Sequence, residues 1–111
     1  MEISSVIKDV THEMRLLFGT NLQEVILFGS YSRGDFDEWS DVDIMVLVNE
    51  SKENIQNMEA KVLDISTAIG QRHGLLTCII VQNYEFFEHW IEFLPFYETV
   101  RKEGKQYYVA A

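Results

Sequence analysis

Residues 28–46 decide the fold, and they read Phe-Gly-Ser-Tyr-Ser-Arg-Gly-Asp-Phe-Asp-Glu-Trp-Ser-Asp-Val-Asp-Ile-Met-Val. Gly29 and Ser30 follow the short apolar run at 24–28, which predicts a buried strand. A glycine at a strand end lets a ligand approach the backbone, and the free amides of a helix that begins there suit a phosphate. Arg33, one turn later, adds a cation that either faces the same phosphates or caps the loop. The segment therefore predicts a strand, a phosphate-binding turn and a short helix.

Two aspartates, Asp41 and Asp43, follow this turn. They lie two residues apart at the start of the apolar run 42–48, and the alternation of a strand places both carboxylates on one face. Two carboxylates side by side on an apolar strand are costly unless a cation lies between them. Mg²⁺ meets that need, since it takes one or two carboxylates plus phosphate oxygens. The alternative for an isolated pair is that Asp41 caps a turn and Asp43 is solvated at the strand start.

The rest of the chain alternates between helical and strand patterns. Apolar residues at spacings of three and four predict a helix at 3–18 and another that begins at Ser51. The apolar run 75–81 predicts a third strand, and residues 107–109 predict a short edge strand. Together with a C-terminal helix, this order predicts an α/β fold with a central sheet, in a single domain over 1–111.

The C-terminal third is the most aromatic part of the chain. Its apolar residues form a helical stripe wider than the ~100° that a helix needs for its own core: Phe86, Phe87, Trp90, Ile91, Phe93, Leu94 and Tyr97. We therefore expect this helix to contact another chain, either a second copy or a different protein. Pro95 kinks the helix or opens a new one, and Gly104 ends it.

Composition excludes several classes of protein. Apolar residues make up 47% of the 111 and charged residues 24%, as in ordinary globular domains. The net charge of −9 disfavours direct nucleic-acid binding and nucleotide binding without a metal ion. No apolar run approaches the ~20 residues that span a bilayer, and residues 1–5 do not resemble a secretion signal. The single Cys78 forms no internal disulfide, which favours a reducing, cytoplasmic setting.

The spacing of Gly-Ser, ten residues, then Asp-x-Asp resembles the active-site pattern of the minimal nucleotidyltransferases in the DNA polymerase beta superfamily. Flanking residues agree with that pattern: Phe28, Arg33-Gly34, Ser40 and Ile44. The resemblance covers residues 20–81 by element order, and residues 96–104 are also similar to these proteins. It implies the nucleotidyltransferase fold, a small central mixed β-sheet flanked by helices.

The resemblance also implies roles for the residues. Gly29 and Ser30, with Arg33, would bind a nucleoside triphosphate, expected to be ATP. Asp41 and Asp43 would bind Mg²⁺ and steer the in-line attack of an acceptor hydroxyl on the α-phosphorus, with pyrophosphate leaving. The nucleotide transferred would be AMP, to a hydroxyl of a protein or small molecule. Proteins of this size often pair with a helical HEPN-type protein as the antitoxin of a toxin–antitoxin module.

The chain departs from the family at the third carboxylate, which active members usually carry on the next core strand. Residues 75–81 contain no acid, Thr77 or Cys78 occupies the place, and Glu85 is the nearest acid that follows. Three functions therefore stay open. The chain is an AMP-transferring enzyme, an inactive module that neutralises a HEPN-type partner by binding, or a fragment that modifies drugs together with a separate substrate-binding chain.

Overall fold

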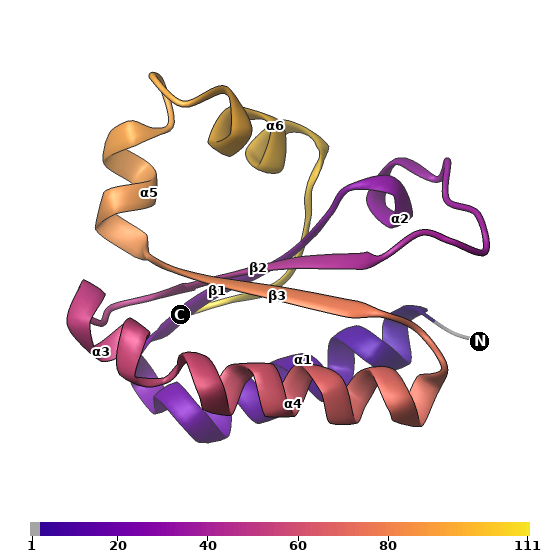
Figure 1. Cartoon of the computed structure of the whole chain (residues 1–111). Coiled ribbons are helices and arrows are strands. Elements are labelled where there is room, and N and C mark those ends of the chain that lie inside the picture. Colours follow the sequence, from indigo (N-terminus) through magenta and orange to yellow (C-terminus); the bar gives the residue numbers. More distant parts are fainter. Residues whose placement is uncertain (1–2) are drawn as a thin grey trace.

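A four-stranded sheet forms the centre of the molecule in a computed structural model that describes residues 3–111 (Figure 1). The strand order is β3-β2-β1-β4. β1 (Leu22–Phe28) pairs antiparallel with both β2 (Val42–Val48) and β4 (Lys105–Val109), whereas β3 (Thr77–Asn83) pairs parallel with β2. The prediction of an α/β fold with a small mixed sheet is confirmed.

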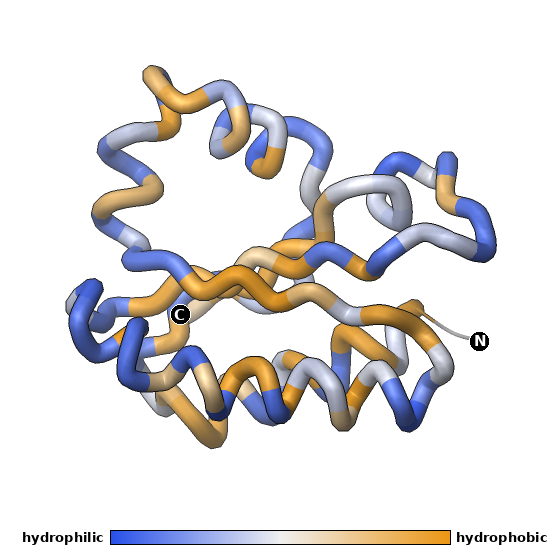
Figure 2. Tube along the Cα trace, in the orientation of Figure 1, coloured by the Kyte–Doolittle hydropathy of each residue, from blue (hydrophilic) through white to orange (hydrophobic). Residues whose placement is uncertain are grey.

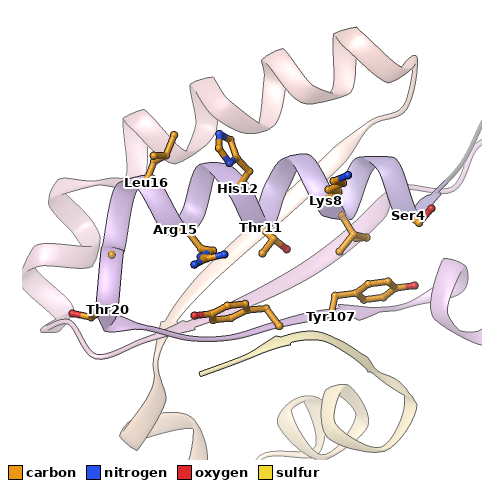
Figure 3. A pocket seen from close by; sticks show the side chains of 11 residues that line it. Ser4, Lys8, Thr11, His12, Arg15, Leu16, Thr20 and Tyr107 are labelled. Carbon is orange, nitrogen blue, oxygen red and sulfur yellow. The ribbon is translucent and has the colours of Figure 1, made fainter. Parts of the chain in front are cut away.

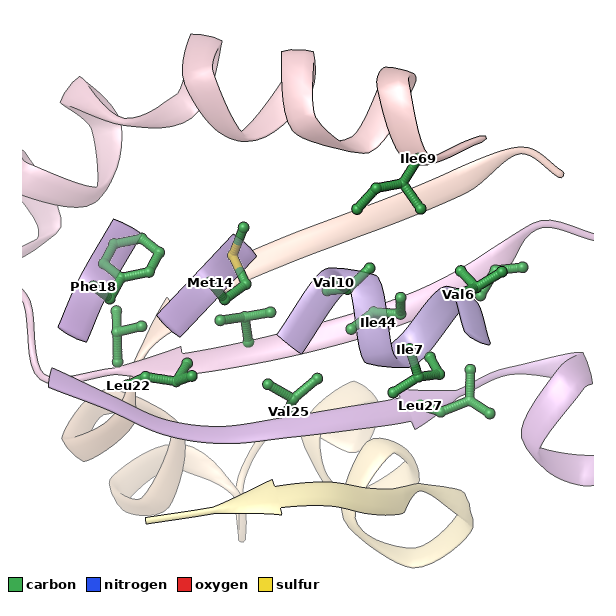
Figure 4. Close-up of a cluster of buried hydrophobic side chains, with 13 residues drawn as sticks. Val6, Ile7, Val10, Met14, Phe18, Leu22, Val25, Leu27, Ile44 and Ile69 are labelled. Atoms are coloured by element: carbon green, nitrogen blue, oxygen red, sulfur yellow. The ribbon is translucent and has the colours of Figure 1, made fainter. Parts of the chain in front are cut away.

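Two long helices, α1 (Ile3–Phe18) and α4 (Glu59–His73), cover one face of this sheet (Figure 1). The buried side of α1 carries residues such as Val10 and Met14, which pack with Ile44 of β2 in the larger of two hydrophobic cores (Figure 4). Figure 2 shows hydrophobic residues along the middle of the sheet and hydrophilic residues in the loop after residue 33. None of the helices within residues 3–111 is long and apolar enough to cross a membrane.

Two short helices, α5 (Tyr84–Trp90) and α6 (Pro95–Glu103), cover the opposite face (Figure 1). Phe87 is fully buried there in a second core, which also contains Ile26 of β1 and Met45 of β2. Three short helices serve as connections: the 3-10 turn η1 (Gly19–Asn21), α2 (Ser30–Arg33) and α3 (Lys52–Asn57). The sheet is therefore the middle layer of three, and its carboxylate-bearing end lies next to α2.

A buried ion pair ties the C-terminal elements to β1. The Glu24 carboxylate is 4% exposed and accepts two hydrogen bonds from the Arg101 guanidinium, at 2.8 and 3.1 Å. Arg101 also pairs with Glu88 of α5 and lies over the Phe87 ring, 5.1 Å from its centre. Gln106 of β4 donates a further hydrogen bond to Glu24. One guanidinium thus joins α5, α6 and β1.

The structure corrects one predicted helix and decides between the two alternatives predicted at Pro95. The helix expected from Ser51 is interrupted at Met58, after Asn57, a residue that favours turns over helix interiors. The C-terminal stripe is divided between α5 and α6, because Pro95 opens a new helix instead of continuing the old one. The strands predicted at 24–28 and 75–81 run over Leu22–Phe28 and Thr77–Asn83.

Candidate active site

Gly29 sits where β1 ends and α2 begins, and only glycine suits that position. Its backbone angles are φ +74° and ψ −158°, a combination that side-chain-bearing residues rarely adopt. A Cβ atom on Gly29 would lie 2.5 Å from Oδ2 of Asp43, closer than real Cβ contacts. Gly29, which the sequence predicts to let a ligand approach the backbone, therefore also allows the turn to lie against the carboxylate of Asp43.

The turn is held rigid by α2. The Gly29 carbonyl accepts hydrogen bonds from the amides of Ser32 and Arg33, both at 3.0 Å. The buried Ser32 hydroxyl donates to the Glu103 carbonyl at the end of α6. Ser30, the first residue of α2, is half-buried beside Gly29. Gly29 and Ser30, the residues expected to bind the nucleotide, thus lie on a turn that the contact between Ser32 and Glu103 holds in place. No local sequence pattern predicts that contact.

Asp41 and Asp43 lie at the start of β2, on the side of Gly29. Asp41 directly precedes the strand and is exposed, whereas Asp43 is half-buried and lies opposite Phe28 of β1 in the register. Burial, and secondarily the charge of Asp41, raises the pKa of the Asp43 carboxyl above its usual value. The alternative that Asp43 is simply solvated at the strand start does not fit, because the side chain is half-buried and interacts with the charge of Asp41.

This donor set suits a hard divalent cation. Mg²⁺ commonly takes one or two carboxylates and completes its octahedral shell with water and substrate phosphate oxygens. The carboxylates of Asp41 and Asp43 repel each other, and a bound divalent cation would relieve that repulsion. Among residues 3–111, no group of three His, Cys, Asp or Glu side chains is placed to hold a metal ion. The two aspartates would therefore hold the ion together with phosphate oxygens and not as part of an all-protein cage.

Arg33, the last residue of α2, pairs with two acidic side chains. Its guanidinium forms ion pairs with Asp35 at 3.1 Å and Glu103 at 3.4 Å. Its positive charge also acts to lower the pKa of Asp43, which shows that it is within electrostatic reach of the aspartates. Contact of Arg33 with a nucleotide phosphate stays a prediction.

The strand register decides between Thr77 and Cys78. Cys78 lies opposite Asp43 in the parallel pairing of β2 and β3 and shares its face of the sheet. Cys78 is exposed at the edge of the sheet, but partial desolvation of its thiol, and then the charges of Asp43 and Asp41, raise its pKa. Thr77 is buried on the other face, and its carbonyl accepts a hydrogen bond from Ser66 of α4. Of the two residues that the resemblance leaves open for the third carboxylate, Cys78 is therefore the one on the face of Asp43.

Glu85 does not complete the site. It lies in the first turn of α5, after the end of β3, whereas the aspartates lie next to the start of that strand. Because β2 and β3 run parallel over seven residues, these ends are about 20 Å apart at ~3.3 Å per residue. The third carboxylate that the family pattern calls for is thus absent from β3 and is not supplied from α5.

Asp37, an acidic residue in the loop between α2 and β2, has a structural role. Its Oδ1 accepts hydrogen bonds from the Trp39 amide at 2.9 Å and the Ser40 hydroxyl at 3.2 Å. Aspartate side chains commonly stabilise turns by accepting hydrogen bonds from the residues that follow them. These hydrogen bonds order the loop between α2 and β2 and so position Asp41. The Asp-x-x-Ser spacing of residues 37–40 is the sequence signal for this turn.

A cavity of about 770 Å³ lies at the other edge of the sheet, between α1 and β4 (Figure 3). Lys8, His12 and Arg15 line it from α1, and the Arg15 guanidinium lies 5.5 Å from the ring centre of Tyr108. None of the predicted site residues lines this cavity. We therefore place the candidate active site at the aspartates.

Residues 7–108 match the family of nucleotidyltransferase domains, and the chain belongs to that family. A relative from Methanocaldococcus jannaschii is 36% identical over 81 residues, covering 73% of this chain and 80% of the relative. A second protein of the same organism is 29% identical over 108 residues, covering 97% of this chain and all of the relative. Both are named for an inferred protein adenylyltransferase activity.

Solved structures share the fold. A protein of Sulfolobus solfataricus, named as a nucleotidyltransferase by inference, has a TM-score of 0.63 at 24% identity over 95% of this chain and 78% of its own. A toxin–antitoxin structure with AMP-PNP has a TM-score of 0.60 at 20% identity, over 92% and 72%. A complex of tri-AMPylated Shewanella oneidensis HEPN toxin with MNT antitoxin has a TM-score of 0.50 at 19% identity, over 94% and 72%. The predicted resemblance to minimal nucleotidyltransferases is confirmed.

Proposed function

We propose that this chain transfers AMP from ATP, with Mg²⁺, to a hydroxyl group of a partner protein. The observation that carries the proposal is the placement of the Asp43 carboxylate against the Gly29 turn, with the charge of Asp41 acting on that same carboxylate. Membership of the nucleotidyltransferase family and the names of the Methanocaldococcus jannaschii relatives support it.

The reaction divides the work between the turn and the strand. The Gly29–Ser30 turn would bind the triphosphate through backbone amides and the Ser30 hydroxyl, and Asp41 and Asp43 would hold Mg²⁺. Bound Mg²⁺ supplies charge neutralisation at the phosphates. The acceptor oxygen forms a bond to the α-phosphorus, the bond from that phosphorus to pyrophosphate breaks, and the hydroxyl proton passes to solvent. Positioning and electrostatics supply most of the rate in such transfers.

The proposed partner is a helical HEPN-type protein, with this chain as its antitoxin in the cytoplasm. The largely aromatic surface exposed by α5, α6 and the connection between them supports a contact with such a protein or with a second copy: Phe86 44%, Trp90 39%, Phe93 63%, Leu94 38% and Phe96 47% exposed. The similar folds described above include antitoxins in complex with toxins. Light scattering of this chain with a purified HEPN-type companion should show a complex, and Trp90→Glu with Phe93→Glu should abolish it.

Cys78 favours a second candidate function, that of an inactive module which neutralises its partner by binding alone. A thiol is a soft ligand and a poor substitute for a carboxylate on Mg²⁺. In this case the fold and the aromatic surface would be retained while AMP transfer is lost. The two functions differ in whether AMP is found covalently attached to the partner.

Calorimetric titration with ATP tests the nucleotide site. The native chain should bind ATP in the presence of Mg²⁺ and lose most of that affinity without it, because its net charge of −9 repels a free triphosphate. Asp41→Asn with Asp43→Asn should weaken the Mg²⁺-dependent binding at least tenfold. Glu53→Gln with Asp64→Asn changes the net charge equally on the exposed surfaces of α3 and α4 and should bind as the native chain does. Equal binding with and without Mg²⁺ in all three proteins would contradict the proposal.

A further inference from the structure

A groove of about 480 Å³ runs along the outer side of β3, between that strand and the helices α3 and α4. Its lining is mainly apolar and ends at a candidate catalytic residue; it includes Ile55, Leu63, Leu76, Cys78, Ile80 and Asp41. Leu63 and Leu76 are 66% and 70% exposed, and unlike the equally exposed Leu16 on α1 they lie together along one groove. The groove therefore joins an exposed apolar surface to the active site.

β3 is an unprotected edge strand. Within residues 3–111 it pairs with β2 alone, in an unbroken register from Thr77 to Asn83. Edge strands usually carry a lysine, a proline or a bulge that prevents pairing with another chain, and the seven residues Thr-Cys-Ile-Ile-Val-Gln-Asn contain no charge and no proline. The opposite edge, β4, begins with Lys105 and shows a register shift against β1. Only β3, of the two edges, is thus suited to accept an additional strand.

Charge restricts what can occupy the groove. The charged residues that line it are Asp41 and Glu59, both acidic, within a chain of net charge −9. An acidic segment is repelled there, and a second copy of this chain brings nine further negative charges to the contact. An extended, apolar segment without acidic residues, from a different protein, is the complementary occupant.

The strand order also matches the geometry of the transfer. β2 lies between β1 and β3, so Asp43 has the Gly29 turn on one side and Cys78 with the groove on the other. In-line displacement at the α-phosphorus requires the acceptor and the leaving pyrophosphate on opposite sides. With the triphosphate at the turn, an acceptor that arrives along β3 reaches the site from the side that the reaction needs.

From these observations, and resting on the proposed function, we infer that the acceptor protein docks an extended segment as an added strand on the free edge of β3. The groove spans Leu76 to Val81, about 20 Å at ~3.3 Å per residue, which accommodates about six residues. The residue that bears the acceptor hydroxyl lies at the Asp41 end of this segment. Apolar side chains of the segment lie on Leu63 and Leu76.

Two pools of six-residue peptides, each ending in tyrosine or serine, test the inference. One pool carries valine or isoleucine with one lysine, and the other carries the same residues with glutamate at alternate positions, so that both pools have the same single acceptor hydroxyl. With α-labelled ATP and Mg²⁺, the native chain should label the apolar pool about tenfold more than the acidic pool. Leu63→Glu and Leu76→Glu should each raise the KM for the apolar pool about tenfold with kcat unchanged. Leu16→Glu, 71% exposed on α1, is the matched control and should behave as the native chain does.

Equal labelling of both pools, or native kinetics in both groove variants, would overturn the docking inference. If the native chain labels neither pool, hydrogen exchange of residues 77–83 with the apolar pool and Mg²⁺-ATP decides. Slowed exchange supports docking, whereas unchanged exchange with ATP binding intact overturns docking and leaves the proposed function in place. If the native chain does not bind ATP with Mg²⁺ at all, the proposed function is overturned instead. A native dimer that Leu63→Glu dissociates would assign the edge to self-association and also overturn the inference.

Discussion

Replacing Gly29 by alanine tests whether the turn and the Asp43 carboxylate form one unit. An added Cβ would lie 2.5 Å from Oδ2 of Asp43, so that carboxylate must move by about 0.9 Å to reach an ordinary contact of 3.4 Å. Gly34 is the matched control, because it too has a positive φ, of +86°, yet an added Cβ there meets no atom within 4 Å. Gly34→Ala thus imposes backbone strain without displacing Asp43.

Gly29→Ala should also lower the melting temperature more than Gly34→Ala does. Residues forced into such backbone regions cost about 1–3 kcal/mol, and the region of Gly29 is almost reserved for glycine. In a chain of this length 1 kcal/mol corresponds to about 4 °C in Tm. Gly29→Ala should therefore lower Tm by about 4–12 °C, and Gly34→Ala, in the milder left-handed region, by about 4 °C.

Binding of Mg²⁺-ATP separates the two variants further. A displacement of this order at a catalytic site can reduce function by about 10²-fold, so Gly29→Ala should lose at least tenfold in affinity by calorimetry. Gly34→Ala should bind as the native chain does at a temperature where both are folded. The reasoning is wrong if Gly29→Ala retains native affinity, or if Gly34→Ala loses as much.

Three further changes act on stability. Arg101→Met leaves the 4%-exposed Glu24 carboxylate buried without its guanidinium, and should cost about 3–5 kcal/mol in urea unfolding; adding Glu24→Gln should recover part of it, and no recovery would argue against this cause. Burial raises the pKa of Asp43, so the native state binds that proton more tightly than the unfolded chain and loses stability as the pH rises through the folded value. Asp43→Asn should accordingly stabilise the metal-free chain at pH 7 by about 1 kcal/mol in thermal unfolding, and a destabilised variant would refute this. The hydrogen bond from His73 lowers the pKa of Asp9, so its contribution, about 0.5 kcal/mol, is present above the unfolded value of 3.8 and lost as the pH falls through the folded value; Asp9→Asn should remove this acid-dependent loss between pH 5 and 2.5, and an unchanged pH profile would count against it.

Local patterns were enough to predict the parts of the fold that depend on local physics. The strand Val42–Val48 and the helix Ile3–Phe18 have the predicted bounds, because period-two and period-3.6 burial can be read within one element. The shared face of Asp41 and Asp43 stays a prediction from the same alternation, because β2 begins at Val42; the charge of Asp41 does act on the Asp43 carboxyl. Ser51 also caps its helix as its side chain suggests, by accepting a hydrogen bond from Asn54.

Non-local features could not be predicted in this way. The choice between Thr77 and Cys78 depends on the register of β3 against β2, which residues far apart in the sequence determine. The pair between Glu24 and Arg101 joins residues 77 positions apart, and a buried glutamate on an apolar strand gives no indication of its partner. Arg33 could be recognised as a cation near the turn, but its pairing with Glu103 required the folded chain.

Transfer of label from α-labelled ATP to a purified HEPN-type companion tests the central claim most directly. With Mg²⁺, the native chain should attach AMP covalently but slowly, because Cys78 stands where a carboxylate would assist the acceptor hydroxyl, help worth on the order of 10²–10⁴-fold. Cys78→Asp should speed the transfer at least tenfold, Cys78→Asn should not, and Asp41→Asn with Asp43→Asn should abolish it. If neither the native chain nor Cys78→Asp labels a companion that both bind, the claim of AMP transfer is contradicted.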